Sequence, residues 1–195
     1  MQKFSKQIVL ASASPRRIEL LNELNLDFTT HPSDFNESET SLPAKELVLH
    51  NAIGKAQKIA RHYKNALIIG VDTVGAFKNH ILEKPKDRED AAEILRLLSN
   101  TTHSVLSSIA IINTNGGKMV TGIEETFITM DRLSEEDIYG YIDSGEGEDK
   151  AAGYAIQGKG ALFVKRIEGD YFNVVGLPIF LLRKMLKEFG YKNWF

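Results

Sequence analysis

Two short, wholly apolar runs place the strongest limit on how this chain can fold. Residues 8–11 read Ile-Val-Leu-Ala, and residues 66–71 read Ala-Leu-Ile-Ile-Gly-Val. Runs of this length, rich in β-branched residues and without polar alternation, are typical of strands buried on both faces. Such strands need helices to cover the sheet that they form. The sequence therefore predicts an α/β protein.

The remaining segments predict a mixed sheet and not a strictly alternating one. Helical patterns occur at residues 14–25, 43–63, 88–98, 134–142 and 178–189. An edge strand is expected at 27–31, a short ribbon at 77–82 and two long strands at 103–113 and 119–130. The long strands flank Asn115-Gly116-Gly117, a strong hairpin signal. A second hairpin is expected from residues 161–167 and 171–175, after a polar loop at 144–150.

Composition narrows the class of protein further. A chain of 195 residues, 43% hydrophobic and 26% charged, fits one soluble domain over residues 1–195, with two lobes. The net charge of −2 argues against a nucleic-acid-binding protein, which is usually basic. The lack of cysteine excludes disulfides and thiol chemistry. No apolar run approaches ~18 residues and the N-terminal segment lacks a signal-peptide core, so we expect a cytoplasmic protein without a membrane partner.

The turn after the first apolar run carries two adjacent arginines. It reads Ala-Ser-Ala-Ser-Pro-Arg-Arg over residues 11–17, with Ser14 as a favourable N-cap and Pro15 at the first helical position. Arginines at a helix N-terminus oppose the helix dipole unless an anion binds there. Arg16, Arg17 and the hydroxyl of Ser12 would suit phosphate oxygens. Two solvated arginines beside an ordinary cap are the open alternative.

The second apolar run leads directly into Asp72 and Thr73, at a strand end where α/β proteins bind ligands. A carboxylate beside a phosphate site would repel the ligand unless a divalent cation lies between them or the carboxylate activates water. Glu37, with Asp34 and Glu39 nearby, offers a second carboxylate from an acidic loop. The alternatives are a turn-capping aspartate and a solvated loop.

Three further polar residues are candidates for binding. Lys84 precedes a proline that restricts its backbone, and Lys55 lies at the edge of the apolar face of a predicted helix. Gln157 can both donate and accept hydrogen bonds, as reading a nucleobase edge requires. Surface lysines and an ordinary loop glutamine are the alternatives. Walker, G-x-G-x-x-G and G-x-S-x-G motifs do not occur, and the histidines lack metal-ligand spacing.

Six segments, taken in order, resemble the Maf family of nucleoside triphosphate pyrophosphatases: LASASPRRIELL, GVDTV, EKPKDREDAAEILRLLS, HSV, DKAAGYAIQGKGALFV and GDYFNVVGLP. The resemblance spans residues 8–186 and is closer to the branch acting on dTTP and UTP than to that acting on 7-methyl-GTP. It implies hydrolysis to a monophosphate and pyrophosphate with Mg²⁺ or Mn²⁺, with CTP and modified pyrimidine nucleotides as further substrates to consider. It also implies an elongated mixed β-sheet flanked by helices, two lobes around a substrate cleft (the Maf/ITPase-like fold) and a homodimer.

The resemblance assigns expected roles at matching positions. Asp72 falls on the proton acceptor and metal ligand, and Glu37 on a second metal ligand. Phosphate-contacting positions are matched by Ser12, Arg16, Arg17, Lys55 and Lys84, of which the two lysines are also expected to assist catalysis. Positions that choose the base are matched by Arg16, Thr73 and Gln157.

Two other functions stay open at this point. One is a nucleotide-sensing regulator of septum formation and cell division that does not turn over its ligand. The other is a purine pyrophosphatase for inosine or xanthosine triphosphate. The presence of both Asp72 and Lys84 favours an enzyme, because a sensor needs phosphate ligands but no base.

Overall fold

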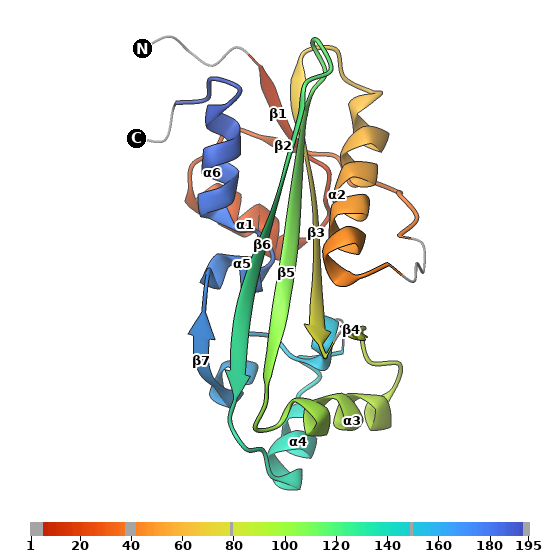
Figure 1. Cartoon of the computed structure of the whole chain (residues 1–195), viewed down its shortest axis with the longest axis vertical. Coiled ribbons are helices and arrows are strands. Elements are labelled where there is room, and N and C mark those ends of the chain that lie inside the picture. The colour runs from red at the N-terminus through yellow and green to blue at the C-terminus, as the bar shows by residue number, and fades with distance from the viewer. Residues whose placement is uncertain (1–5, 38–41, 79, 149, 193–195) are drawn as a thin grey trace. The chain divides into compact units, whose positions relative to one another are not determined.

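The chain folds into two compact units that share three long strands. A computed structural model describes residues 6–37, 42–78, 80–148 and 150–192 (Figure 1). Unit 1 comprises Met1–Thr73, Ser107–Glu124 and Gly176–Phe195, and unit 2 comprises Val74–Leu106 and Glu125–Val175. The shared strands are β3 (Ala66–Phe77), β5 (Thr102–Asn113) and β6 (Met119–Met130).

The strands form a mixed seven-stranded sheet, which confirms the predicted fold class. Its order is β2-β1-β3-β5-β6-β7, with β4 paired to β3. β1 (Gln7–Leu10) is parallel to β2 (Thr29–Thr30) and to β3, and Val9 lies opposite Ile68. β4 (His80–Leu82) and β7 (Val164–Glu168) pair antiparallel with β3 and β6. Both wholly apolar runs are therefore strands.

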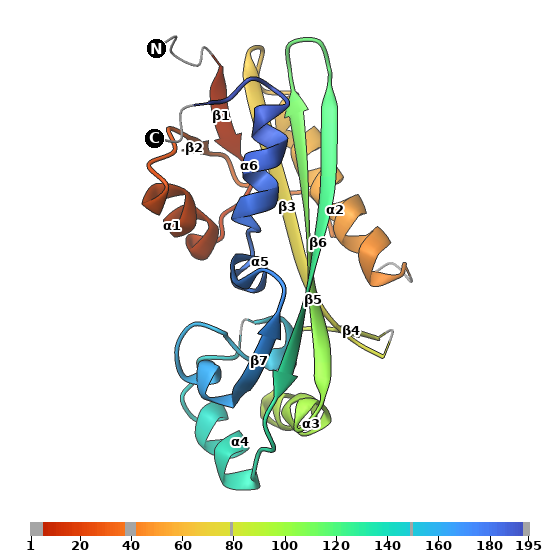
Figure 2. The same cartoon turned by 60° about the vertical axis from the view of Figure 1, so that its left-hand side comes forward.

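In unit 1, helices cover both faces of the sheet. Figures 1 and 2 show α2 (Ala44–Ala60) on one face and α1 (Pro15–Glu23) and α6 (Ile179–Lys187) on the other. Small residues on α2 pack against β3, and a Cβ added to Gly70 would lie 2.2 Å from the carbonyl oxygen of Ala52. Glycine at this position therefore lets α2 approach β3 closely, two residues before Asp72.

In unit 2, two helices close the core. α3 (Arg88–Leu98) packs on α4 (Glu135–Ile142), with Leu95, Ile128 and Met130 among the buried residues beneath them. α4 begins with a capping box, in which the side chain of Ser134 accepts from the backbone of Asp137 and the Asp137 side chain accepts in return. None of the helices in the described ranges has the length and apolar character that a bilayer crossing needs.

The second predicted hairpin is wrong. Residues 171–175 form a short helix, α5 (Tyr171–Val175), and β7 pairs with β6 instead. The Asp170 side chain accepts a hydrogen bond from the Phe172 backbone at 2.8 Å, and the fully buried Asn173 donates to the Val105 carbonyl and the Thr126 hydroxyl, each at 2.9 Å. The local bond at Asp170 and the tertiary bonds of Asn173 together override the strand propensity of these residues.

Two 3₁₀ segments, η1 (Ala151–Gly153) and η2 (Lys159–Phe163), complete unit 2. The other helices begin and end within a few residues of the predicted bounds. Asn25, the last residue of the helix predicted over residues 14–25, adopts a left-handed φ of 51° just after α1.

Candidate active site

Asp72 lies on the face of β3 that α2 covers. Successive strand residues point to opposite faces, so Ile68, Gly70 and Asp72 share one face and Thr73 points to the other. Asp72 is only 4% exposed, which is unusual for a carboxylate. An aspartate so deeply buried needs partners, and α2 supplies them.

Asn51 and Lys55, one helical turn apart on α2, both reach Asp72. The Asn51 amide donates to Oδ2 at 3.0 Å, and the Lys55 ammonium donates to Oδ1 at 2.7 Å. Residues four apart lie on the same helix face, so the spacing makes this double contact possible. The same ammonium lies 2.6 Å from Oε1 of Glu37, whose side chain is half exposed.

Lys55 thus stands between two carboxylates, and the three groups carry a net charge of about −1 in their ordinary ionic states. This net negative charge would favour the binding of a further cation. Carboxylate oxygens are the ligands that Mg²⁺ and Mn²⁺ prefer, and Mg²⁺ is often held by one or two carboxylates together with substrate phosphates. Within the described ranges no three His, Cys, Asp or Glu side chains gather as a metal site. Asp72 and Glu37 fit a cation that is shared with a phosphate ligand.

Arg17 makes its contacts on the opposite face from Asp72. Its guanidinium donates to the carbonyls of Gly176 at 2.8 Å and Val71 at 3.1 Å. It also donates to the hydroxyls of Ser12 at 3.2 Å and Thr73 at 3.1 Å. These bonds occupy four of its five N–H groups and join α1 to the middle of β3 and to the start of the C-terminal segment.

Two opposing effects of its surroundings act on the pKa of Arg17. Burial lowers the pKa of Arg17, and the nearby carboxylates of Asp72 and Glu37 oppose that shift. Because Arg17 donates to four acceptors of the protein itself, its place at the helix N-terminus is explained without a bound phosphate. Its neighbour Arg16 is half-buried in the same turn.

The start of α1 also differs in detail from its prediction. Ser14 occupies the N-cap position, but its side chain makes no capping bond. The Ser12 hydroxyl accepts from the backbone of Ser14 at 3.2 Å, besides its bond from Arg17. The Thr73 hydroxyl lies 2.8 Å from that of Ser107 and 3.4 Å from the carbonyl oxygen of Gly176. Both hydroxyls are therefore held in place by the protein.

Lys84 and Gln157, the other predicted site residues, belong to unit 2, and both are exposed. Gln157 precedes Gly158, whose φ of 103° is a conformation that favours glycine. The carboxylate of Glu146 accepts from the backbone of Lys159 at 2.9 Å and of Gly160 at 3.3 Å. These contacts anchor the backbone that follows Gln157. Glu39, proposed as a neighbour of Glu37, lies outside the described residues.

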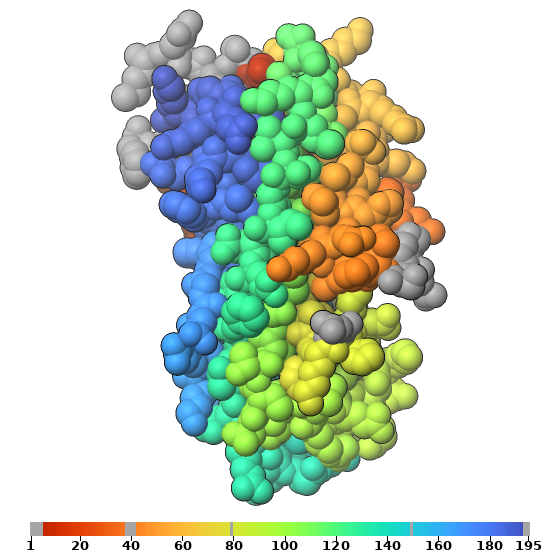
Figure 3. All heavy atoms as spheres, viewed as in Figure 1, coloured from red at the N-terminus to blue at the C-terminus, as the bar shows by residue number. Residues whose placement is uncertain are grey.

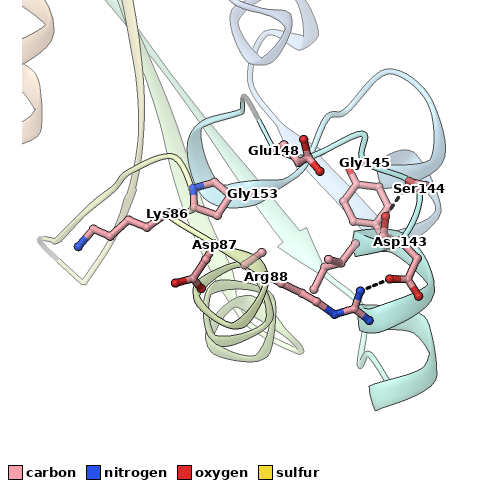
Figure 4. Close-up of a pocket in the computed structure, with 13 residues that line it drawn as sticks. Lys86, Asp87, Arg88, Asp143, Ser144, Gly145, Glu148 and Gly153 are labelled. Carbon is pink, nitrogen blue, oxygen red and sulfur yellow. Dashed lines mark hydrogen bonds and ion pairs between the residues drawn. The ribbon is translucent and has the colours of Figure 1, made fainter.

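Two surface cavities lie away from these residues. One, of about 610 Å³, is formed in unit 2 by the start of α3, the end of α4 and the loop after it, and Figure 4 shows Arg88 turned toward Asp143 beside it. The other, of about 410 Å³, lies in unit 1 between the end of α2 and the tip of the β5–β6 hairpin, two segments that meet on the surface in Figure 3. None of the predicted site residues lines either cavity.

Sequence reasoning did not identify Asn51, Ser107 or Gly176. Asn51 had a usable signal, because it stands four residues before Lys55 in a predicted helix and so shares its face. Ser107 and Gly176 had none, since their contacts with Thr73 and Arg17 join segments far apart in the chain.

The fold and the family agree with comparisons to known proteins. The structure of the Ham1 protein of Staphylococcus aureus superposes with a TM-score of 0.53, covering 94% of this chain and 99% of that one, at 16% identity. At that identity the likeness concerns the fold alone. Residues 7–189 match the family described as Maf-like protein, and the chain belongs to that family.

Relatives in this family carry one recurring name. Proteins called dTTP/UTP pyrophosphatase are 45% identical in Dictyoglomus turgidum (95% of this chain, 97% of the relative), 47% in Acetivibrio thermocellus (94% and 96%) and 43% in Methanosarcina barkeri (95% and 95%). The family membership predicted from the six segments is confirmed.

Proposed function

We propose that this protein hydrolyses dTTP and UTP to the nucleoside monophosphate and pyrophosphate. The observation that carries the proposal is Asp72, a buried carboxylate held on both oxygens within β3, which continues to Phe77 and does not end at residue 71 as the sequence predicted. It occurs in a chain that is 43–47% identical to proteins named dTTP/UTP pyrophosphatase. A positioned carboxylate is the group that such a hydrolysis needs to act on water.

In the reaction, Asp72 orients a water molecule and accepts its proton as the oxygen attacks the α-phosphorus. A new bond forms between that oxygen and the α-phosphorus, and the bond from the α-phosphorus to the bridging oxygen breaks. Pyrophosphate leaves with the electron pair of that bond. Most of the rate acceleration in phosphoryl transfer comes from positioning and charge stabilisation, which a pre-held carboxylate beside fixed cations supplies.

The phosphate charge is neutralised by the cationic side chains that the family resemblance assigns to it. Lys55 lies beside Asp72 already, and Arg16 stands at the N-terminus of α1, where backbone N–H groups also favour an anion. The resemblance assigns the same role to Lys84. Arg17, bound to four acceptors of the protein, holds Ser12 and Thr73 in place and supports the site indirectly.

We further propose that the reaction requires Mg²⁺ or Mn²⁺, with Asp72 and Glu37 as its protein ligands. Such a cation would neutralise phosphate charge and strengthen the electrophilic character of the phosphorus. The two carboxylates converge on one positive charge, the Lys55 ammonium, and this supports the proposal that they share a cation. Base selection is proposed for Arg16, Thr73 and Gln157.

The test is pyrophosphate release from dTTP, UTP, CTP, 7-methyl-GTP and ITP, with Mg²⁺, with Mn²⁺ and with EDTA. We expect metal-dependent turnover that is fastest with dTTP and UTP. The Asp72→Asn variant, purified in parallel, controls for contaminating phosphatases. Tight binding of nucleotide without turnover would favour the sensing regulator instead, and preference for ITP would favour the purine pyrophosphatase.

The resemblance also leads us to propose a homodimer that acts in the cytoplasm, with a part in septum formation as a further role. Light scattering of the purified protein tests the dimer, because a monomer would have a mass of 21.8 kDa. Cell length after deletion of the gene, compared with rescue by Asp72→Asn, tests whether the cellular role depends on catalysis.

A further inference from the structure

Two side chains of α2 hold Asp72 in different ways. Asn51 donates to Oδ2 at 3.0 Å and Lys55 to Oδ1 at 2.7 Å, so the carboxylate cannot rotate without breaking one of the two bonds. Lys55 is shared, because its ammonium also lies 2.6 Å from Glu37. Asn51 contributes orientation without charge. The two contacts are therefore not equivalent.

The side chain of Asn51 is poorly explained by packing alone. The residue is 3% exposed, and its Oδ1 has no hydrogen-bond partner within the described part of the chain. An apolar residue of similar shape would fill this position without burying an unpaired oxygen. The orientation of the amide follows from Asp72, since turning it over would place two acceptor oxygens together. The carboxylate that the amide faces therefore explains its presence.

We propose that Asn51 is a positioning residue for the hydrolysis. It holds the carboxylate of Asp72 in a fixed orientation while the Lys55 ammonium binds the phosphates. The inference rests on the proposed function. A triphosphate attracts the ammonium and weakens its hold on Oδ1, which becomes free to accept from water. The neutral amide is not drawn toward the phosphates and keeps Oδ2 fixed. Asn51 thus preserves the orientation of the Asp72 carboxylate when Lys55 binds the triphosphate.

Two variants test the proposal by steady-state kinetics on the best substrate. Asn51→Leu removes the donor, and the near-isosteric Asn51→Asp replaces it with an acceptor that repels Asp72. We expect each to lower kcat about 10- to 100-fold, because a small misplacement of a catalytic group has effects of this size, with KM within about threefold. Gln57→Leu, which removes an exposed amide from the same helix, is the matched control and should leave both constants unchanged.

A double-mutant cycle separates positioning from a general structural role. If Asn51 acts through Asp72, then Asn51→Leu should have no further effect on kcat in the Asp72→Asn background. Normal kcat in both Asn51 variants would overturn the proposal. So would multiplying effects of the two substitutions, since these would show that Asn51 acts independently of Asp72.

The same proteins distinguish this proposal from the proposed function. If the wild-type protein released no pyrophosphate, the proposed function would fall, and a positioning role in that reaction would fall with it. The same double-mutant cycle, measured by thermal unfolding, would then still test whether Asn51 and Asp72 interact. Non-additive shifts in Tm would confirm that the amide and the carboxylate act on one another, and additive shifts would remove that contact as well.

Discussion

Each unit of the molecule buries a pair of titratable side chains that contact one another, and the two pairs differ in charge. In unit 1, Asp72 and Lys55 are both buried and make an ion pair at 2.7 Å. In unit 2, His103 is 2% exposed and its Nε2 lies 2.8 Å from the hydroxyl of Tyr154. Burial lowers the pKa of His103 to about 4 and raises that of Tyr154, so this pair is neutral near pH 7.

The difference indicates what each pair is for. Desolvating two charges often costs as much as their attraction returns, so a buried ion pair is weak evidence of a stabilising role. A neutral hydrogen-bonded pair is far easier to bury and helps to fix a unique core. The charged cluster around Asp72 is therefore consistent with the catalytic role proposed for it, and the neutral pair of His103 and Tyr154 with a role in stability. The following experiments test this distinction between the two pairs.

The largest effect is expected from Asp72→Asn, compared with His103→Gln. Loss of the proposed general base should lower kcat about 10³-fold. The amide keeps the shape of the side chain, and Lys55 keeps Glu37, so the free energy of unfolding should change by less than about 1 kcal/mol. His103→Gln should instead leave kcat within about threefold. Steady-state kinetics and urea unfolding of both variants measure the contrast, and a large loss of stability in Asp72→Asn would contradict it.

The next effect concerns pH and stability in unit 2. His103 has a folded pKa of about 4, below its ordinary value of 6.5, so the unfolded chain binds the proton more readily. The stabilisation is fully present above pH 6.5 and is lost as pH falls toward 4, by about 3 kcal/mol in total. His103→Gln should flatten this part of the stability curve. Urea unfolding between these pH values measures it, with the exposed His80→Gln as the control in the same unit. Parallel curves for wild type and His103→Gln would assign the acid sensitivity to other groups.

The sequence predicted the elements of the sheet better than the contacts of its polar residues. The apolar run at residues 66–71 and the hairpin at Asn115-Gly116-Gly117 are local signals, and both were correct. Helix α5 was missed, because Asn173 is fixed by bonds to Val105 and Thr126, which are far away in the chain.

The candidate site shows the same limit. Asp72, Lys55 and Glu37 were named from the sequence, and the structure brings all three together. The arrangement of Arg17 was not predictable, since its acceptors Val71 and Gly176 are backbone carbonyls, which any residue offers. Asp72 and Thr73 were placed in one site, whereas strand alternation directs them to opposite faces of the sheet.

Arg17→Lys tests whether Arg17 is part of the structure, and should have an effect of intermediate size. Lysine cannot reproduce the planar fork of the guanidinium, so the carbonyls of Val71 and Gly176 would lose donors. We expect a loss of about 2 kcal/mol in the free energy of unfolding. Arg16→Lys, at the adjacent position, is the matched control and should stay within about 0.5 kcal/mol while raising KM. If the two variants were equally stable, Arg17 would have no structural role of this kind and would again be a candidate phosphate ligand.

The smallest expected effect asks whether Gln157 takes part in recognition of the base. Gln157→Ala should change the ranking of dTTP, UTP and CTP by about 1 kcal/mol in relative kcat/KM, the scale of a single hydrogen bond to a base. Lys159→Ala, two residues on and also exposed, should leave the ranking unchanged. A changed ranking would mean that Gln157 contributes to the choice of base. If Gln157→Ala altered all three substrates equally, its effect would arise from the conformation of the loop that Glu146 anchors, and the base would be read by Arg16 and Thr73.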